Sequence, residues 1–424
     1  MIGEPSITVA VRGHAIYIRR FELVVVAGPD AGARAVSDSD ELTIGTATGA
    51  GLRLTDAAVS RLHCAVRATA RGLELRDLGS TNGTFVGEHE LRHAFVRTGT
   101  RLQLGHTTVA IAILDDEIAQ PLADASRYGE LIGSSPAMRQ LYPRIEQVAS
   151  RDAPVLLTGE TGTGKELVAE AIHLASPRRR GPFIVVDCGA LPRLHAEAAL
   201  FGDARGGPGA ARPGAFAEAH GGTLLLDEIG DLPLELQPLL RRVLEDGRVL
   251  PVGGDRAYAV DVRVIAASHR DLRVEVNARR FRADLYYRLD VLRVAVPALR
   301  DRDGDLPLLA AQFWRQARPG EDIPPELVAA LAQQSWPGNV RELRAAVERT
   351  ALHGWAPPPH AEPAYGQAKE AAIEKWERPW LEALLARHGH NLSRAARAAQ
   401  MGRSHLRQLC QRHGLRAAAD GDGG

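Results

Sequence analysis

The sequence predicts a multidomain chain made of an all-β domain, an α/β domain and a small all-α domain. Between residues 21 and 114, short apolar clusters such as FELVVV and TTVAIAIL alternate with Gly, Asp, Ser and Asn turns, which is typical of an all-β domain. Between residues 129 and 353, buried-type strands such as FIVVD alternate with helical stretches such as ELVAEAIHLA, which indicates a parallel α/β sheet. Residues 367–416 have a helical pattern.

Two segments are expected to separate these domains. Residues 115–128, DDEIAQPLADASRY, are acidic and lack clear periodicity, so we expect a linker. Residues 354–366, GWAPPPHAEPAYG, contain prolines that prevent regular structure and make a stiff spacer. With 424 residues, the chain is long enough for each domain to bury its own core.

The composition indicates a reducing compartment and a polyanionic partner. The 52 basic and 52 acidic side chains balance, but residues 383–419 contain seven arginines and no carboxylate. The three cysteines are far apart and lack metal-type spacing, which argues against a disulfide framework. The sequence has no apolar run of membrane-spanning length and no signal-peptide pattern at its start. We therefore expect a cytoplasmic protein without a membrane partner.

The stretch GETGTGKE follows the strand-like PVLLT and opens the helical ELVAEAIHLA, a context that predicts a phosphate-binding loop. Its glycines let backbone N–H groups approach phosphate oxygens, and the helix N-terminus adds partial positive charge. Lys165, one of only three lysines, would reach the terminal phosphates as a compact ammonium. A glycine turn with a surface lysine is the alternative. The expected nucleotide-binding residues are Gly159, Glu160, Thr161, Gly162, Thr163, Gly164, Lys165 and Glu166.

A second motif, GGTLLLDEIGDL, places Asp227 and Glu228 at the end of a fully apolar strand. We expect Asp227 to coordinate the Mg²⁺ of a nucleotide and Glu228 to polarise the attacking water, the two roles that phosphoryl transfer requires. An acidic turn after a buried strand is the alternative, and the nearby phosphate-binding loop argues against it.

Residues 129–353 resemble the AAA+ domain of bacterial enhancer-binding proteins, which use ATP to activate sigma-54 RNA polymerase. The resemblance rests on GETGTGKE, GGTLLLDEIGDL, VRVIAASHRDL, FRADLYYRLDVL and WPGNVRELR. It implies ATP hydrolysis, with ATP and Mg²⁺ as cofactors. Glu is common after the loop lysine in this family, so Glu166 is a family trait.

The resemblance also implies roles by position. Arg282 and Arg288 match arginine fingers that enter a neighbouring subunit's site, which implies a homo-oligomeric ring, expected to be a hexamer; ordinary surface charge is the alternative. Arg341 matches the second sensor, which contacts the nucleotide. Ser268 and His269 occupy the first sensor, where the family often has Thr and Asn.

Two segments depart from the family pattern. Asp187 stands where studied members have an Asn hydrogen-bonded to the catalytic glutamate, and because an ionised carboxylate cannot donate, we expect Asp187 and Glu228 to share a proton or a water. Between Gly202 and Arg212 the chain reads DARGGPGAA, shorter than the family's GAFTGA loop and without the Phe-Thr tip that grips the sigma factor. We expect ATPase activity and oligomerisation with little or no sigma-54 open-complex formation. The alternatives are backbone engagement of sigma-54 by the shortened loop, or another partner.

Near the start, LTDAAVSRLHCAV and LRDLGSTNGTFVG resemble the forkhead-associated domain, a β-sandwich that binds phosphothreonine peptides through its loops. The positions matched to phosphopeptide binding are Ser60, Arg61, Thr81 and Asn82, and charge-assisted hydrogen bonds from such groups suit a dianionic phosphate. Thr46 stands where the family usually has a phosphate-binding Arg. A sandwich used only for packing or for phosphate-independent contacts is the alternative.

At the other end, NLSRAARAAQMGRSHLRQLCQRHGL resembles the Fis-type helix-turn-helix, which implies double-stranded DNA as a partner. The residues placed to meet bases or phosphates at the start of the recognition helix are Arg403, Ser404, His405 and Arg407. A solvated basic helical hairpin is the alternative.

The combined features predict an ATP-hydrolysing, DNA-binding transcription regulator of the sigma-54 activator type with a degenerate sigma-54 loop. One rival is an ATP-dependent DNA-binding regulator or scaffold that acts without sigma-54 and is gated by phosphopeptide binding. A second rival, an AAA+ remodeller of other proteins, leaves the helix-turn-helix pattern unexplained.

Overall fold

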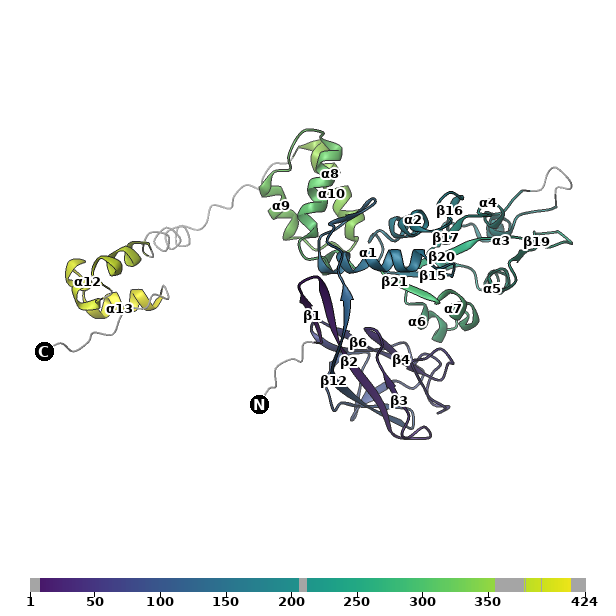
Figure 1. Ribbon diagram of the computed structural model, residues 1–424, viewed down its shortest axis with the longest axis horizontal. Coiled ribbons are helices and arrows are strands. Elements are labelled where there is room, and N and C mark those ends of the chain that lie inside the picture. Colours follow the sequence, from purple (N-terminus) through teal and green to yellow (C-terminus); the bar gives the residue numbers. More distant parts are fainter. Residues whose placement is uncertain (1–7, 206–211, 355–376, 378, 390, 413–424) are drawn as a thin grey trace. The chain divides into compact units, whose positions relative to one another are not determined.

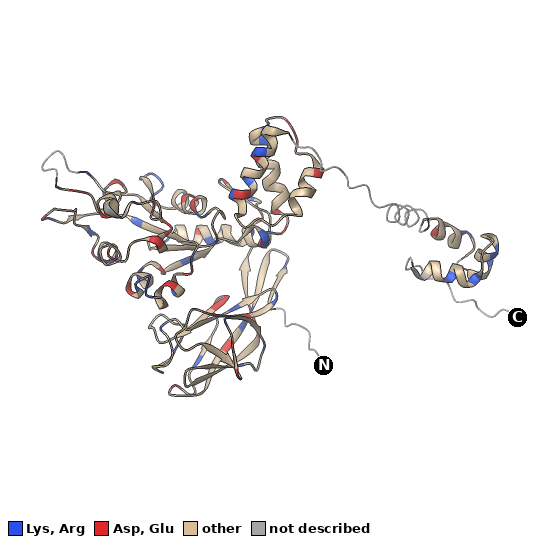
Figure 2. Ribbon diagram, turned by 180° about the vertical axis from the view of Figure 1, so that it is seen from behind, with Lys and Arg blue, Asp and Glu red and all other residues tan. Residues whose placement is uncertain are grey.

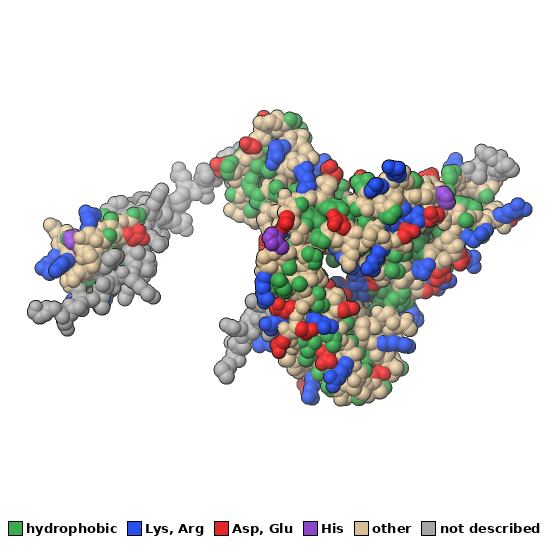
Figure 3. Space-filling model, viewed as in Figure 1, with side chains coloured by type: hydrophobic (Ala, Val, Ile, Leu, Met, Phe, Trp, Pro, Cys, Tyr) green, Lys and Arg blue, Asp and Glu red, His purple; other side chains and the backbone are tan. Residues whose placement is uncertain are grey.

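The computed structural model describes residues 8–205, 212–354, 377, 379–389 and 391–412 (Figure 1). The chain divides into two compact units, Met1–Gly354 and Trp355–Gly424. The first unit contains the predicted all-β and α/β domains, and the second contains the C-terminal helices. On the face of the first unit that Figure 3 shows, acidic and basic side chains are interspersed, in keeping with the balanced composition.

The first domain is a sandwich of two β-sheets, as the alternating clusters predicted. One sheet has the order β1-β2-β12-β11-β8-β9, with β3 also paired to β2, and the other has the order β10-β7-β6-β4-β5. Alternate side chains of β2 are buried in a core shared by both sheets. The strands are β1 (Val9–Arg12), β2 (Ala15–Ala27), β3 (Arg34–Val36), β4 (Glu41–Gly45), β5 (Leu52–Arg53), β6 (Cys64–Thr69), β7 (Gly72–Asp77), β8 (Thr84–Val86), β9 (His89–Glu90), β10 (His93–Val96), β11 (Arg101–Leu104) and β12 (Thr107–Pro121).

Both ends of this domain differ from the prediction. The sandwich begins at Val9, and β12 continues to Pro121, so the expected linker at residues 115–128 is wrong for its first half. A bulge between Ile113 and Glu117 re-registers β12 against the start of β2. Its acidic side chains are paired across the sheet, with Arg12 2.9 Å from Glu117, and these charges hid the strand pattern.

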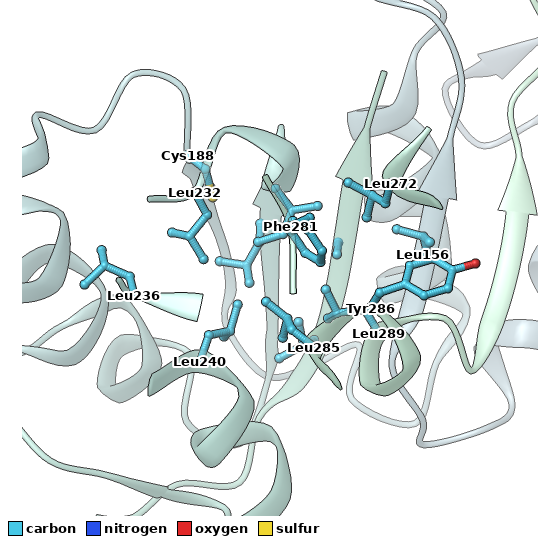
Figure 4. Close-up of a cluster of buried hydrophobic side chains, with 14 of the residues drawn as sticks. Leu156, Cys188, Leu232, Leu236, Leu240, Leu272, Phe281, Leu285, Tyr286 and Leu289 are labelled. Carbon is cyan, nitrogen blue, oxygen red and sulfur yellow. The ribbon is translucent and has the colours of Figure 1, made fainter. Parts of the chain in front are cut away.

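The second domain is built on a five-stranded parallel sheet in the order β16-β17-β20-β15-β21. Two apolar clusters pack against the sheet, and Figure 4 shows part of one of them, where Phe281 and Leu285 lie between Leu232 and Leu240 on one side and Tyr286 and Leu289 on the other. The strands are β15 (Val155–Thr158), β16 (Phe183–Asp187), β17 (Thr223–Asp227), β20 (Arg263–Ser268) and β21 (Leu292–Ala295), with small pairs β13 (Arg127–Tyr128), β14 (Leu131–Ile132), β18 (Arg248–Val249) and β19 (Tyr258–Ala259).

Helices flank this sheet, and a helical lid follows it. The buried carboxylate of Asp305 accepts the backbone N–H groups of Ser134 (2.6 Å) and Ser135 (2.8 Å), which ties the first lid helix to the start of the domain. The helices are α1 (Pro136–Ala149), α2 (Lys165–Ala175), α3 (Arg193–Phe201), α4 (Ala215–Glu218), η1 (Ile229–Asp231), α5 (Gln237–Asp246), α6 (Leu272–Asn277), α7 (Ala283–Leu289), η2 (Leu299–Asp301), and in the lid α8 (Asp305–Ala317), α9 (Pro325–Ala332) and α10 (Asn339–His353).

The second unit is helical wherever it is described. Residues 379–387 are helical, followed by α12 (Leu392–Ala398) and α13 (Arg403–Arg412). Ala395, Ala396, Leu406 and Cys410 share one small core with leucines of the preceding helix. The expected spacer at residues 355–366 lies outside the described residues. Throughout the described ranges, no helix has both the length and the apolar character required to cross a membrane.

Candidate functional site

The predicted phosphate-binding loop lies at the carboxyl end of β15, between β20 and β21 in the sheet. Gly162 (φ 79°) and Gly164 (φ 98°) adopt left-handed conformations that favour glycine. A Cβ on Gly162 would lie 2.2 Å from the carbonyl oxygen of Gly338, so the loop and the lid approach too closely for a side chain. The eight predicted nucleotide-binding residues therefore form one turn that opens α2.

Lys165 lies over this turn and is only 6 % exposed. Its ammonium donates to the carbonyl oxygens of Gly159 (3.1 Å) and Glu160 (3.2 Å) and lies 3.6 Å from Glu228 Oε1. A buried ammonium at a helix N-terminus is costly unless anionic oxygens compensate it. A polyphosphate would supply those oxygens, which fits the role predicted for Lys165.

Glu228 lies at the end of β17 in a left-handed conformation (φ 49°, ψ 48°), which is unusual for a residue with a side chain. Its Oε2 accepts the Nδ1–H of His269 at 2.6 Å and the backbone N–H of His269 at 3.2 Å. Burial would raise the pKa of Glu228, but the hydrogen bonds from His269 and the charge of Lys165 outweigh it, so the net pKa is lowered. The carboxylate is thus kept ionised and aimed, as a group that polarises water must be.

The structure does not pair Asp187 with Glu228, so the expectation that they share a proton is wrong for a direct contact. The Asp187 carboxylate instead accepts the N–H groups of Gly189 (2.9 Å) and Ala190 (3.2 Å). His269 holds Glu228 in its place, and reasoning from the sequence missed this role. The sequence did point to this position, because it placed Ser268 and His269 at the first sensor, which lies at the end of β20.

Asp227 has the surroundings that a divalent cation would favour. Burial and the neighbouring negative charge of Glu228 raise the pKa of Asp227, so its ionised form is unfavourable without added positive charge. Within the described residues, no three metal-binding side chains converge. Mg²⁺ is commonly held by one or two carboxylates together with nucleotide phosphates, and Asp227 fits that arrangement.

The start of α10 connects the lid to the phosphate-binding loop. The Asn339 side chain donates to Glu160 Oε2 and to the carbonyl oxygen of Thr161, both at 3.1 Å, and the backbone N–H of Arg341 donates to Gly162 at 3.2 Å. The Arg341 side chain is exposed beside the loop, a position compatible with its expected sensor role. Asn339 was not anticipated from the sequence.

The two expected arginine fingers lie on one segment and are held within their own chain. Arg282 precedes α7 and makes two hydrogen bonds to Asp284, at 3.0 and 2.9 Å. Arg288, in the last turn of α7, donates to the carbonyl oxygen of Leu244 at 3.1 and 2.7 Å. To reach a neighbouring subunit, each guanidinium would have to exchange these partners.

The four expected phosphopeptide-binding residues converge on two neighbouring loops of the first domain. The Ser60 hydroxyl accepts the backbone N–H of Thr81 at 3.0 Å, and the Asn82 amide donates to Ala58 at 2.8 Å. Arg61 is exposed beside them. Buried His63 braces both loops, because its ring contacts Ser60 N (3.1 Å) and Gly83 O (3.0 Å). The cluster is polar and contains one exposed guanidinium, that of Arg61.

Arginines recur along α12 and α13 of the C-terminal unit (Figure 2). Leu406 and Cys410 of α13 are buried, and Leu409 packs against the same core, so this side of the helix faces inward. The exposed residues at the start of α13 are Arg403, Ser404, His405 and Arg407.

Three family models match parts of residues 24–354. Residues 131–295 match the family described as the sigma-54 interaction domain, and residues 300–354 match the AAA+ ATPase lid domain. Residues 24–114 match the cytoplasmic domain of the inner membrane component of T3SS.

Individual relatives match the same parts of the chain. The anaerobic nitric oxide reductase transcription regulator NorR of Shigella flexneri is 43% identical over 324 residues, which cover 69% of this chain and 64% of NorR, just under two thirds of its length. NtrX from Brucella abortus in complex with ATP is 38% identical, covering 69% of this chain and 71% of NtrX with a TM-score of 0.50. The FHA domain of the CT664 protein from Chlamydia trachomatis is 27% identical over 22% of this chain and 96% of that domain, with a TM-score of 0.21.

Proposed function

This chain belongs to the family of proteins that carry the sigma-54 interaction domain, and from this premise we propose that it is an ATP-hydrolysing, DNA-binding transcription regulator of the sigma-54 activator type. The observation that carries the proposal is the convergence of Lys165, Glu228 and His269 at the phosphate-binding loop, with Lys165 3.6 Å and His269 2.6 Å from opposite oxygens of Glu228. Phosphoryl transfer is catalysed mainly by positioning and charge, and these residues supply both.

In this proposal, the loop N–H groups and Lys165 bind the phosphates of ATP, and Glu228, aimed by His269, accepts a proton from the attacking water. Asp227 would hold Mg²⁺, which neutralises charge on the phosphates when bound. Asn339 and Arg341 connect the loop to the lid, so a change at the phosphates can move α10. Arginine fingers from a neighbouring subunit would complete the site in a ring, expected to be a hexamer.

Engagement of sigma-54 is the part of the proposal that the shortened loop places in question. Residues 206–211 of that loop lie outside the described residues, but its stem is described: Asp203 and Arg212 exchange two backbone hydrogen bonds of 3.0 Å. The tip sequence GGPGA lacks an aromatic or hydroxyl group to insert. We propose that ATP hydrolysis proceeds with little or no sigma-54 remodelling.

Transcription from a sigma-54 promoter tests this proposal. With purified protein, ATP and sigma-54 polymerase, we expect few or no open complexes from the natural chain. A chain with a full GAFTGA loop grafted between Gly202 and Arg212 is expected to form them, because the ATPase core is intact. Abundant ATP-dependent open complexes from the natural chain would contradict the proposal, and the grafted chain carrying Glu228→Gln is the control for dependence on hydrolysis.

We further propose that α13 reads duplex DNA. Residues 383–419 contain seven arginines and no carboxylate, and α13 exposes Arg403 and Arg407. DNA affinity should fall steeply as salt rises, because arginine contacts release counterions from the phosphates. Arg407→Ala should reduce sequence preference by about 1–3 kcal/mol if this side chain meets a base edge. Unchanged DNA affinity after deletion of residues 367–424 would place the DNA site elsewhere.

For the first domain, we propose binding of a phosphothreonine peptide at Ser60, Arg61, Thr81 and Asn82. The exposed guanidinium and the hydrogen-bonded hydroxyl pair support this proposal. The alternative is an ATP-dependent DNA-binding regulator or scaffold that acts without sigma-54 and is gated by the same peptide. Both proposals expect few open complexes from the natural chain, and open complexes from the grafted chain would favour an ATPase core of the sigma-54 activator type.

A further inference from the structure

The first domain packs directly on the segment that carries the expected arginine fingers. Leu62 and Leu78 of the sandwich are 2 % and 0 % exposed and belong to the same apolar cluster as Leu272 and Val276 of α6. The Asn277 side chain at the end of α6 donates to the carbonyl oxygens of both Leu62 (2.5 Å) and Leu78 (2.9 Å). Figure 1 shows α6 and α7 beside β4 and β6. The contact shares a core and satisfies backbone groups, so it is a built interface.

Buried charges strengthen this interface. Arg273 of α6 is 7 % exposed, and its guanidinium pairs with Glu41 of the sandwich as well as with Asp271 of its own domain. Arg293 of β21 lies 3.2 Å from the same oxygen of Glu41. A single carboxylate of the first domain thus compensates two arginines of the second. Removing Glu41 would leave Arg273 with Asp271 and Arg293 with Asp290, and would delete the carboxylate that joins the two domains.

The interface uses the loops that carry the expected phosphopeptide residues. Arg61 is followed by Leu62, which packs against the second domain, and Thr81 is preceded by Leu78 and Gly79, which contact Asn277 and Val274. The loop after Thr46 also takes part, because a Cβ on Gly49 would lie 2.8 Å from the ring of Tyr287 on α7. A ligand that moves any of these loops would therefore change their contacts with α6 or α7.

The packing around α7 is incomplete. A cavity of about 380 Å³ lies between the sandwich and α7, lined by Thr48, Gly49 and Leu62 on one side and by Tyr286 and Tyr287 on the other. Within the described residues, the Tyr287 hydroxyl is buried without a hydrogen-bond partner. The docked state is therefore held by Glu41 and Asn277, and its packing leaves this cavity beside the ligand loops.

We propose that the first domain clamps the arginine-finger segment of its own chain with the loops that also bind a phosphothreonine peptide, and that peptide binding opens this clamp. Tyr287, the residue before Arg288, is held under Gly49, while the Arg288 guanidinium is retained by Leu244. Release of α7 frees the helix to present Arg288 to a neighbouring subunit. This inference rests on the proposed phosphopeptide binding and ring ATPase.

The test compares Glu41→Ala with Asp40→Ala in the full chain. Asp40 is the adjacent residue and pairs with Arg67 inside the sandwich at 2.9 Å, so it controls for loss of a carboxylate in the same place. Glu41→Ala is expected to raise the ATPase rate at protein concentrations that limit assembly, and Asp40→Ala to leave it unchanged. Asn277→Ala, which removes the amide bridge and leaves every charge, should act like Glu41→Ala. Equal rates in the wild type and all three variants would overturn the clamp.

The second measurement is binding of a pool of random-sequence peptides with a fixed phosphothreonine, against the same pool with threonine. Because coupling between two sites is reciprocal, Glu41→Ala should bind the phosphorylated pool at least about fivefold more tightly than the wild type, and that pool should raise the wild-type ATPase rate. Equal binding to wild type and Glu41→Ala would contradict the clamp while leaving phosphopeptide binding intact. No binding by any chain would contradict phosphopeptide binding and with it the opening step, whereas the ATPase comparison would still report the clamp.

Discussion

Replacing Glu228 by Gln is expected to abolish ATP turnover while leaving ATP binding intact. Gln has nearly the same shape and keeps an oxygen that can accept the two hydrogen bonds from His269. It loses the negative charge that draws a proton from water, and a positioned general base contributes about 10²–10⁴-fold to such rates. Phosphate release measures turnover, and titration with a fluorescent nucleotide measures binding. Turnover at the wild-type rate in Glu228→Gln would remove Glu228 from the catalytic role.

Lys165→Ala is the matched comparison, because it should weaken binding as well as turnover. Lys165 lies inside the loop, and its loss removes the ammonium that would contact the phosphates. Two further variants test whether His269 is the group that orients the Glu228 carboxylate. His269→Ala should lower kcat with little change in KM, and His269→Asn should restore part of it through its amide N–H. Asp187→Asn should change neither kcat nor KM, because the Asp187 carboxylate contacts Gly189 and Ala190.

Much of this site could be predicted because its motifs are local. A strand, a glycine turn and a helix follow one another in GETGTGKE, and the carboxyl ends of parallel strands meet at one edge of a sheet, which brings Asp227 and Glu228 to Lys165. The secondary structure at each motif is set by residues close in the sequence, and the resemblance of both motifs to one family placed them in one site. The same holds for α13, whose buried Leu406 and Cys410 follow a helical period.

The features that were missed depend on contacts between distant residues. His269 is 41 residues from Glu228 and can hold it only because β17 and β20 are neighbours in the sheet. The order of strands in a sheet is not written in any local pattern. Likewise, Glu41 and Arg273 are 232 residues apart, and each looks like an ordinary surface charge in the sequence. The extension of β12 was hidden because its acidic side chains are satisfied by arginines on β1 and β2.

Arg288→Ala is expected to bind ATP normally and to hydrolyse it poorly, because the guanidinium would act in a neighbouring subunit's site. Arginine fingers in nucleotide hydrolysis are worth about 10³–10⁵-fold in kcat. Among the described residues, Arg288 donates to Leu244 O, far in sequence from the phosphate-binding loop, so its loss should leave the loop's own contacts unchanged. Arg282→Ala should behave in the same way. Arg280→Ala is the control, because Arg280 lies on the same segment but pairs with Glu275 at 2.7 Å.

Mixing subunits distinguishes a finger that acts in trans from a residue that only stabilises α7. A Glu228→Gln subunit lacks the carboxylate and keeps both fingers, whereas an Arg288→Ala subunit keeps the carboxylate and lacks one finger. Where the fingers of a Glu228→Gln subunit enter the nucleotide site of an Arg288→Ala subunit, that interface contains both the carboxylate and the fingers. One complete site is then assembled from two inactive chains. The ATPase rate should therefore pass through a maximum as the mixing ratio varies, although each variant alone is nearly inactive. A rate that stays at the baseline at every ratio would contradict trans action, and Arg288 would then serve α7 through its hydrogen bonds to Leu244 alone.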